Sequence, residues 1–435
     1  MGRIAAASAA GTAIEFYDFF AYGTAAALVL GPLFFPGFSA LAGTLAAFAT
    51  FGVGFVARPL GAVVFGHVGD RYGRRPVLVG SLLLTGLATT AVGFVPSYAT
   101  IGAAAPVILV TLRFLQGLGL GGEWGGAVLL AAEHAPPGRR GLWASLPQTG
   151  PATGFVLANG VLLALSAGLS DAAFRDWGWR VPFWAAGVLA VGGLALRAAL
   201  PETPEFTRVA ERGELARVPL GELFGRHWRL VLLTAGAMAG GYAVFYTVTT
   251  WSLSYATGTL GMPRTTALAA VLVAVLVKGA VTPLVGMLGD RFGRRRLALA
   301  GTGAMAVVIF PYAGLLATGS AAAMALGSTA ELLAFITAFA VLGAYLPELY
   351  EPRVRCTGAA LGYNLGGILG GALTPVVATR LAEGGGGPWP VALYVAAIAL
   401  GSVACFAALP DPGRELASAA PAVATSAATS ASTSP

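Results

Sequence analysis

The chain has 435 residues, of which 57% are hydrophobic and only 10% are charged, and its mean hydropathy is +0.78. A soluble domain averages about 25% charged residues, so this composition excludes an ordinary water-soluble protein and indicates a chain that lies in a lipid bilayer. The net charge of +7 comes from 25 Arg and a single Lys against 19 acidic residues. Most of the Arg lies in short stretches between apolar runs, which is typical of cytoplasmic loops and not of nucleic-acid binding.

In chain order, apolar runs of about 20 residues predict twelve membrane-spanning helices. Six precede a polar central segment and fall near residues 10–34, 41–66, 77–96, 101–131, 142–168 and 181–200. Six follow it, near residues 228–253, 264–288, 297–318, 321–346, 357–381 and 391–409. The first run carries two acids and lacks a small-residue cleavage site, so we expect a retained helix and not a signal peptide.

The polar segment divides the chain into an N-terminal six-helix bundle, residues 1–200, and a C-terminal bundle, residues 228–409, joined by a central loop, residues 201–227. The tail, residues 410–435, is rich in Ala, Ser and Thr, so we expect it to be disordered. The basic residues of alternate loops fall on one side of the membrane, whereas the opposite loops hold little net charge. The positive-inside rule therefore predicts that both termini are cytoplasmic.

A ten-residue motif occurs twice, with an offset of 220 residues. Residues 66–75 read GHVGDRYGRR and residues 286–295 read GMLGDRFGRR, and seven of the ten positions are identical. Each copy is expected in the loop between the second and third helix of its half, and the same offset relates Arg58 to Lys278. Two equivalent six-helix halves predict a transporter in which one half rocks against the other.

The repeated G-x-x-x-D-R-x-G-R-R stretch resembles the signature of the major facilitator superfamily. Four further stretches resemble the metabolite:proton symporters, the branch that carries shikimate, 2-oxoglutarate, citrate, proline and betaine: GTAIEFYDFFAYG (11–23), FVARPLGAVVFGHVGDRYGRR (55–75), LRFLQGLGLGGEWGGA (112–127) and LPETPEF (200–206). The resemblance covers about residues 11–409. It implies an all-α fold of twelve transmembrane helices, in two halves related by a pseudo-two-fold axis, in the inner (plasma) membrane of a bacterium.

Seven charged residues fall within the predicted spans and away from their ends: Glu15, Asp18, Arg58, Arg113, Glu123, Lys278 and Glu331. Each costs about 2.5–3.5 kcal/mol to insert at a helix centre when it is unpaired. We therefore expect these residues to pair with one another or to line a wet cavity. No metal or cofactor site is expected, since the two cysteines are scattered, and a proton gradient would supply the energy.

Proton coupling is expected around the first helix, where three residues share one face at i, i+3 and i+7: Glu15, Asp18 and Tyr22. The resemblance implies that Asp18 faces an arginine of the fourth helix, and Arg113 matches that arginine. No histidine lies within a span, so carboxylates would carry the proton. For Glu15, an ion pair with Arg58 that only joins helices is an equal alternative.

Substrate binding is expected near the membrane midplane, about Arg113. Its planar guanidinium suits a bidentate grip on a carboxylate, with a packing role as the alternative, and Gln116 and Trp124 recur on its face of the helix. Lys278 either binds a substrate carboxylate from the second half or pairs with Glu331, and both interpretations stay open. Polar residues of helices five, seven and eleven either line the cavity or form interhelical hydrogen bonds: Gln148, Asn159, Tyr242, Tyr246 and Asn364.

The two motif loops are expected to gate the transporter, to anchor its topology, or both. The acid of each copy would cap or bridge a neighbouring helix in one state and release it in the other. The candidate gating residues are Asp70, Arg71, Arg74, Arg75, Asp290, Arg291, Arg294 and Arg295, together with Arg58, Glu123 and Glu331.

These features predict a secondary active transporter that takes up a small organic carboxylate with protons by alternating access, as a functional monomer. A proline- or glycine-betaine-type zwitterion symporter is the nearest alternative, and a proton-driven efflux antiporter is a further one. A membrane enzyme or a receptor is disfavoured, because the sequence shows no paired catalytic constellation, metal cluster or soluble domain. The G-x-G-x-x-G of Gly117, Gly119 and Gly122 lies inside an apolar helix with no preceding strand and does not predict nucleotide binding, and ATP-driven pumping is disfavoured because no G-x-x-x-x-G-K-[ST] occurs. The expected partners are a small molecule, protons and the lipid bilayer.

Overall fold

The computed structural model describes residues 2–72, 74–121, 136, 138–198, 225, 227–350 and 355–411. Several predictions lie outside this description. They concern Glu123, Trp124, the central loop and the tail, and the side chains of Glu15, Asp70, Arg71, Arg74 and Arg75. The described residues form helices and turns without a strand, as expected where lipid offers no partner for a backbone N–H or C=O group.

The helices of the N-terminal half follow the predicted order. They are α1 (Gly2–Ala25), the π-helical η1 (Ala26–Leu30), α2 (Gly31–Phe34), α3 (Ala40–Tyr72), α4 (Arg74–Val92), α5 (Tyr98–Ile101) and α6 (Ala104–Leu120). After the gap come α8 (Arg140–Ser145), the 3₁₀ turn η2 (Pro147–Thr149), α9 (Gly150–Gly168), α10 (Asp171–Asp176), the 3₁₀ turn η3 (Gly178–Arg180) and α11 (Val181–Ala198).

The C-terminal half repeats this plan. Its first helices are α14 (Trp228–Tyr246), the π-helical η4 (Thr247–Trp251), α15 (Ser252–Gly258), α16 (Arg264–Phe292) and α17 (Arg294–Ala317). They are followed by α18 (Ala321–Phe339), α19 (Leu342–Glu348), α20 (Arg355–Gly366), the π-helical η5 (Gly367–Ala372), α21 (Leu373–Glu383) and α22 (Trp389–Ala408).

A helix lies at each of the twelve predicted positions, which confirms the predicted fold class. Among the described residues, nine helical stretches are long and apolar enough to cross a membrane. The shorter or less apolar α4, α6 and α11 occupy the remaining three positions. One detail of the prediction was wrong: neither motif is mainly a loop. Helix α3 continues through the first motif to Tyr72, and α4 begins at Arg74. Helix α16 continues through Asp290 to Phe292, and the left-handed Gly293 (φ 94°) alone turns the chain into α17.

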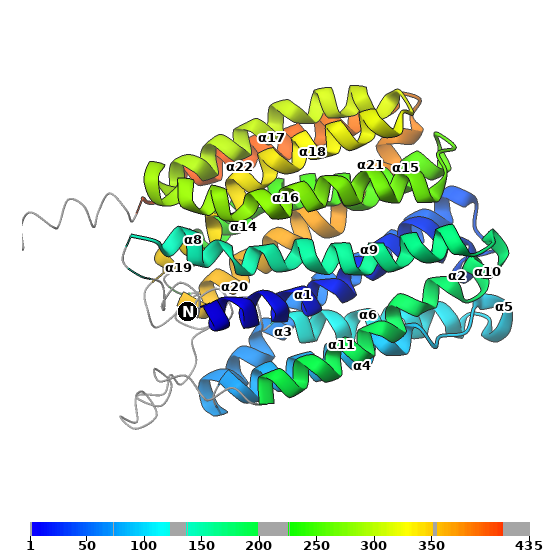
Figure 1. Ribbon diagram of the computed structural model, residues 1–435, viewed down its shortest axis with the longest axis horizontal. Coiled ribbons are helices and arrows are strands. Elements are labelled where there is room, and N and C mark those ends of the chain that lie inside the picture. The colour runs from blue at the N-terminus through cyan, green and yellow to red at the C-terminus, as the bar shows by residue number, and fades with distance from the viewer. Residues whose placement is uncertain are drawn as a thin grey trace, which may run out of the picture.

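The two halves lie side by side, with their long helices running in the same general direction (Figure 1). Helices α8 and α9 pack along α16 on one side of the boundary between the halves, and α3 packs on α20, η5 and α21 on the other. The centre of the molecule, where a transport site is expected, is therefore enclosed by helices of both halves.

Irregular helical segments recur at equivalent places in the two halves. The π-helical η4 lies within one residue of the position that the 220-residue offset assigns to η1, and η5 begins at the offset from η2. Each member of these pairs interrupts a helix that packs at the boundary between the halves. The repeat seen in the motif thus extends to the backbone of the boundary helices.

The two ends of the bundle differ in charge. Asp290, Arg291 and Arg294 lie at the end that holds α8, α19 and the N-terminus, which we call the arginine-rich end (Figure 1). The Tyr345 hydroxyl of α19 donates to the Pro410 carbonyl at 2.8 Å, so the end of α22 lies there as well. The turn after α21 lies at the opposite end.

Labelling of single cysteines tests the predicted orientation. Gly138, two residues before α8, lies at the arginine-rich end, and Gly384, directly after α21, lies at the opposite end. In a chain without Cys356 and Cys405, we expect Gly138→Cys to be protected from a membrane-impermeant maleimide in intact cells and Gly384→Cys to react. The reverse pattern would place the arginine-rich end outside and contradict the positive-inside assignment.

Candidate functional site

A small cavity lies between the two halves, at the level of the middle of α16. Its volume is about 40 Å³, whereas pockets for small molecules commonly measure about 300–1,000 Å³. The conformation is therefore closed around its centre. Both halves contribute to the wall: Phe16, Phe20, Gln148 and Pro151 from the first, and Tyr242, Phe245, Tyr246, Lys278, Phe335, Ile336, Phe339 and Tyr363 from the second.

Four of the predicted substrate-binding residues line this cavity: Gln148, Tyr242, Tyr246 and Lys278. The other wall residues are mostly phenylalanines, which sequence reasoning missed because a phenylalanine in a membrane helix ordinarily faces lipid or a neighbouring helix. A signal was present in their spacing, since Phe16 and Phe20, and likewise Phe335 and Phe339, are four residues apart and share one face of a helix.

Lys278 is buried in the middle of α16, between aromatic rings. Its Nζ atom lies 5.8 Å from the centre of the Phe245 ring and 5.6 Å from that of Phe335. No carboxylate of the described residues lies within 4.0 Å of it. The ion pair with Glu331 that the sequence left open is therefore absent from this conformation, and ring faces replace a counter-ion.

Arg113 is fully buried on α6 and packs against three aromatic rings. Its Cζ atom lies 4.0 Å from the centre of the Tyr22 ring, 5.0 Å from that of Phe19 and 5.5 Å from that of Phe51. The Nη1 atom donates to Gln116 Oε1, whereas Nε and Nη2 have no hydrogen-bond partner among the described residues. Two donors of a buried cation are thus left available.

A second arginine shares the Phe19 ring. The Arg58 Cζ atom lies 4.4 Å from the centre of that ring and 4.9 Å from that of Phe55, and the two guanidinium groups are close enough to interact electrostatically. Asp18 is buried as well, and it lies within electrostatic range of Arg113. The N-terminal half therefore concentrates positive charge around one ring.

An aromatic layer separates these arginines from the cavity. Phe19 and Phe51 contact Arg113, and the same two rings lie 6.1 Å and 5.4 Å from the ring of Tyr246, which belongs to the cavity wall. Arg113 itself is not part of that wall. Of the two predicted anion-binding cations, Lys278 therefore belongs to the cavity wall and Arg113 does not, although Arg113 lies within electrostatic range of Tyr246.

The other predicted polar residues form hydrogen bonds within the protein, most of them to another helix. The Gln116 side chain donates to Thr89 Oγ1 at 2.7 Å, and the Tyr22 hydroxyl lies 2.6 Å from that of Thr50. Asn159 donates to the Phe155 carbonyl of its own helix at 3.0 Å. Asn364 donates to the Gly121 carbonyl at 3.3 Å, which joins the two halves near the arginine-rich end.

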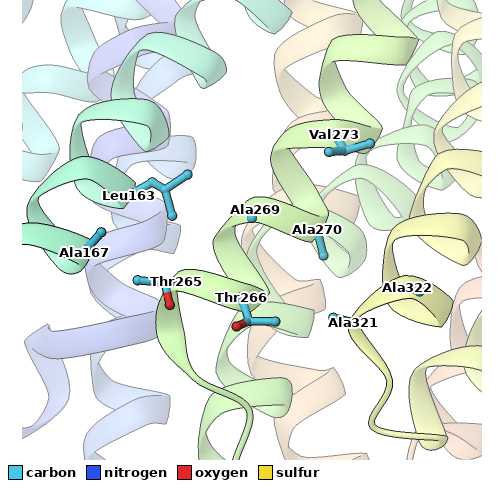
Figure 2. Close-up of a pocket in the computed structure, with 9 residues that line it drawn as sticks. All are labelled: Leu163, Ala167, Thr265, Thr266, Ala269, Ala270, Val273, Ala321 and Ala322. Carbon is cyan, nitrogen blue, oxygen red and sulfur yellow. The ribbon is translucent and has the colours of Figure 1, made fainter.

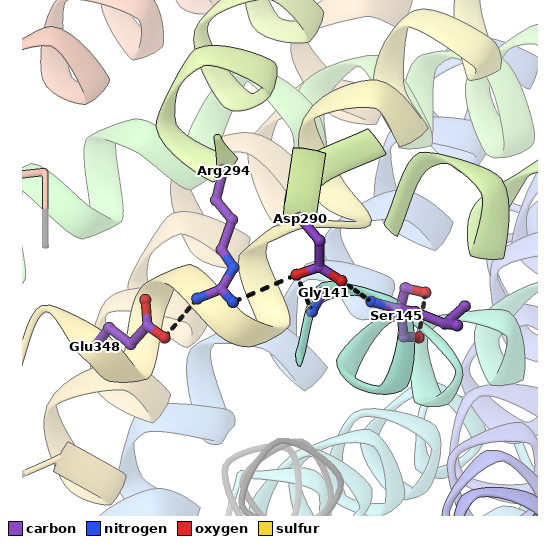
Figure 3. A network of polar contacts seen from close by, with 6 residues as sticks. Gly141, Ser145, Asp290, Arg294 and Glu348 are labelled. Carbon is purple, nitrogen blue, oxygen red and sulfur yellow. Dashed lines mark hydrogen bonds and ion pairs between the residues drawn. The ribbon is translucent and has the colours of Figure 1, made fainter. Parts of the chain in front are cut away.

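Asp290 of the second motif joins the halves at the arginine-rich end (Figure 3). The backbone N–H of Gly141 donates to Asp290 Oδ1 at 2.7 Å, and that of Leu142 donates to Oδ2 at 3.1 Å. Both N–H groups lie in the first turn of α8, where a helix has free donors. Arg294 Nη2 lies 3.5 Å from Asp290 Oδ1, and Arg294 also pairs with Glu348 of α19.

This contact requires small residues on both helices. A Cβ atom on Gly141 would lie 2.6 Å from the Gly286 carbonyl oxygen, and one on Gly286 would lie 2.3 Å from Ser145 Oγ. Gly286 is the first residue of the second motif. This glycine allows the two helices to approach closely, and Asp290 of the same motif forms the hydrogen bonds between them.

The halves also meet at the opposite end, with a weaker contact. Arg264 Nη2 of α16 lies 2.9 Å from Asp171 Oδ1 of α10. The Asp171 side chain is 82% exposed, and exposed ion pairs contribute about 0–1 kcal/mol.

A wider groove of about 660 Å³ lies near that end, between α9, α16 and α18 (Figure 2). Two threonines, Thr265 and Thr266, are its only polar residues, and the others are Leu, Val and Ala. Such a surface suits lipid chains and offers no charge to select a polar metabolite, so the small central cavity remains the candidate site.

Comparison with known proteins gives the family. Residues 4–227 match the family described as "Sugar (and other) transporter", and residues 252–434 match "Major Facilitator Superfamily". The chain is 44% identical to the inner membrane metabolite transport protein YhjE of Escherichia coli over 402 residues, which are 91% of either chain. This chain belongs to the major facilitator superfamily.

Two further relatives of this chain in Escherichia coli have named substrates. The shikimate transporter is 39% identical over 401 residues, 91% of either chain, and the proline/betaine transporter is 33% identical over 404 residues, 91% of this chain and 80% of the relative. Among solved structures, the xylose transporter XylE of Escherichia coli, in a partially occluded inward-open conformation, has a TM-score of 0.74 at 19% identity, over 94% of this chain and 97% of XylE. That likeness concerns the fold alone. The protein is a multi-pass membrane transporter and not an enzyme.

The hydrogen bonds of Asp290 predict that its removal shifts the equilibrium between the closed and open states of the arginine-rich end. In Asp290→Ala, the first turn of α8 loses a charged acceptor, and hydrogen bonds to charged groups contribute about 1.5–3 kcal/mol. We expect the arginine-rich end to open about 10- to 100-fold more often. The measurement is the rate of maleimide reaction at Ser145→Cys, a buried position on α8, in a chain without Cys356 and Cys405.

Asp171→Ala is the matched control, because it removes an interhalf acid that is exposed. That variant should leave the reaction rate at Ser145→Cys within about two-fold, as expected for a surface pair. Equal rates in Asp290→Ala and the parent chain would show that Asp290 does not hold this end closed.

Proposed function

We propose that this protein imports a small organic acid together with protons, by alternating access across a bacterial inner membrane with both termini in the cytoplasm. The observation that supports the proposal most directly is that two donors of Arg113 have no partner among the described residues. Nε and Nη2 lie on the same edge of a guanidinium group and form the fork that binds a carboxylate with two parallel hydrogen bonds. A buried donor without a partner costs about 1–3 kcal/mol, and more when it is charged, so a carboxylate ligand would remove an existing penalty.

Lys278 supplies the second cation of the proposed site. It lies in the cavity wall beside Gln148, so a ligand that enters the cavity meets an ammonium group and an amide. To reach Arg113 as well, the ligand must displace the layer of Phe19, Phe51 and Tyr246. Aromatic pairs contribute about 0.5–1.5 kcal/mol each beyond their burial, an amount that two charge-assisted hydrogen bonds can offset.

Asp18 is the proposed proton carrier of the N-terminal half. An ionised Asp18 competes with a substrate carboxylate for Arg113, since both are anions near the same guanidinium. Protonation of Asp18 frees Arg113 for the substrate, and release of the proton on the other side favours release of the substrate. Binding of the two is coupled in this way by a shared cation.

A zwitterion such as betaine is the second candidate substrate. The observation in its favour is the aromatic wall of the cavity, since ring faces attract quaternary ammonium groups. Lys278 within the same wall repels a cation, and for that reason the carboxylate proposal is preferred.

Uptake into proteoliposomes tests the function, with shikimate, 2-oxoglutarate, citrate, proline and betaine as probes. We expect at least one of the acids to accumulate when the outside is acidic, and Asp18→Asn to abolish that accumulation while exchange of the same probe persists. Asn keeps the shape of the side chain and cannot carry a proton. Accumulation only of betaine or proline would contradict the carboxylate assignment. Gradient-driven accumulation by Asp18→Asn would move the proton role to another acid.

Arg113→Lys tests the grip on the carboxylate. A lysine retains the charge but cannot form the two-pronged contact, and loss of one buried charged partner costs about 2–5 kcal/mol, or roughly 30- to several thousand-fold in affinity. We expect the melting temperature of the variant to be insensitive to concentrations of the transported probe that raise it in the parent protein.

Arg180→Lys serves as the matched control, because Arg180 packs on Trp179 and donates to the carbonyls of Gly93 and Val95, away from the cavity. It should lower the melting temperature yet keep the shift with the probe. A folded Arg113→Lys protein that binds the probe with the affinity of the parent protein would contradict a substrate-binding role for Arg113.

A further inference from the structure

The C-terminal half holds a buried acid that coupling through Asp18 does not use. Glu331, near the middle of α18, is fully buried. Neither Oε1 nor Oε2 has a hydrogen-bond partner among the described residues. In the same part of the chain, no nitrogen of a lysine, arginine or histidine lies within 4.0 Å of either oxygen.

Two hydroxyl groups, those of Ser328 and Tyr312, lie near this acid without a hydrogen bond to it, and the Tyr312 hydroxyl also lies near Ser252 and Ser328. Ser328 lies one turn earlier on the same face of α18, and its Oγ atom is buried with no partner in the described structure. Tyr312 of α17 packs on α18 at Gly327, where a Cβ atom would lie 3.1 Å from the ring. The Tyr312 hydroxyl is also buried without a hydrogen bond of normal geometry, and it lies within electrostatic range of Glu331. We call Ser328, Glu331 and Tyr312 the Glu331 cluster.

The helices that pack against α18 bring few other ionisable groups to this level. These helices are α14, α16, α17 and α19, with the π-helical η4. Their ionisable side chains away from the helix ends are Tyr312, Lys278, Tyr242 and Tyr246. The rest lie at the ends of the spans: Arg229, Arg264, Asp290, Arg291, Arg294, Arg295, Arg296, Tyr345 and Glu348. Lys278 is therefore the one cation that α16 offers near the middle of the membrane.

Burial without a partner determines the state of the acid. An isolated ionised carboxylate in a dry interior costs far more than a protein gains by folding, so such a group takes up a proton instead. A neutral carboxylic acid that lacks hydrogen-bond partners costs much less free energy in the same place. In the closed conformation, Glu331 therefore carries a proton.

A different position of α18 against α16 would allow that proton to leave. Phe335 lies one turn after Glu331 on the same face of α18, and its ring contacts the Lys278 ammonium group at 5.6 Å. A shift of α18 along α16 by about one helical turn, roughly 6 Å for four residues, would exchange the ring for the carboxylate. Lys278 would then gain a counter-ion, and the stability of the pair favours loss of the proton.

We propose that Glu331 is a proton-binding site of the C-terminal half, neutral in the closed conformation, with Lys278 as its counter-ion once the proton has left. The carboxylate takes up one proton from water on one side, and the acid returns that proton to water on the other. The transport of this proton rests on the proposed function, whereas its binding does not.

Infrared difference spectroscopy of the purified, lipid-reconstituted protein tests the binding without any substrate. Perfusion from acidic to alkaline buffer should remove the carbonyl band of a protonated carboxyl group. We expect this band in the parent protein at neutral pH and its loss, in whole or in part, in Glu331→Gln. The matched control is Glu383→Gln at an exposed acid, which should leave the band unchanged.

A second measurement keeps the test decisive if Glu331→Gln fails to fold. In the parent protein grown with [13C]glutamate, the band should move to lower frequency, because a glutamic acid carries it. A band that does not move, or that survives in folded Glu331→Gln with full intensity, overturns the proposal. Loss of the band on addition of sodium ions at constant pH would also overturn it, since the cluster would then bind sodium.

Lys278→Gln tests whether Lys278 is the counter-ion of ionised Glu331. Without the ammonium group, the ionised form of Glu331 loses its partner, so the band should persist to a pH higher by about one unit or more. An unchanged titration in Lys278→Gln would exclude Lys278 as the counter-ion. Failure of the probe uptake described above, with the infrared result as expected, would reject the proposed function and leave the proton site in place.

Discussion

Three cations buried in a medium of low dielectric constant set the organisation of this molecule. Arg58, Arg113 and Lys278 are at most 3% exposed, and insertion of one such charge costs about 2.5–3.5 kcal/mol. Each is instead placed against ring faces, and a desolvated cation–π contact returns about 2 kcal/mol. The rings offset most of the cost and leave a residual attraction for an anion. The many aromatic residues of the centre follow from this balance.

The aromatic layer also explains why the centre is closed. The Phe19 ring contacts both arginines, the Phe55 ring at 4.7 Å and the Tyr246 ring at 6.1 Å. The contacts of a single ring thus reach from the cations of the first half to the cavity wall of the second. Since each aromatic pair is worth about a kcal/mol, the layer is stable enough to exclude water, and the anion that we propose as substrate would have to reorder it.

The two ends of the bundle hold the halves together with unequal strength. At the arginine-rich end, the half-buried Asp290 accepts two backbone hydrogen bonds and is bridged through Arg294 to Glu348. At the opposite end, an exposed Asp171 meets one arginine. A carboxylate at a helix N-terminus that is partly shielded from water contributes more to stability than a carboxylate in an exposed ion pair. Among the contacts between described residues, those at the arginine-rich end are therefore the stronger.

The sequence by itself determined the twelve helices, the repeat and the family, because apolar length and the 220-residue offset are properties of the chain alone. It also identified Arg113, Asp18, Lys278 and Glu331, since a charge in an apolar run is conspicuous in one dimension. Only the tertiary structure decided which of these charges meet. In the structure, Arg113 is covered by aromatic rings and is not part of the cavity wall. Glu331 does not pair with Lys278, and Asp290 accepts hydrogen bonds from the first turn of α8. Such contacts depend on the rotation of each helix and on how the phenylalanines pack. The sequence does not show them, because phenylalanines at ordinary helical spacing look the same whether they pack on a cation or on another helix.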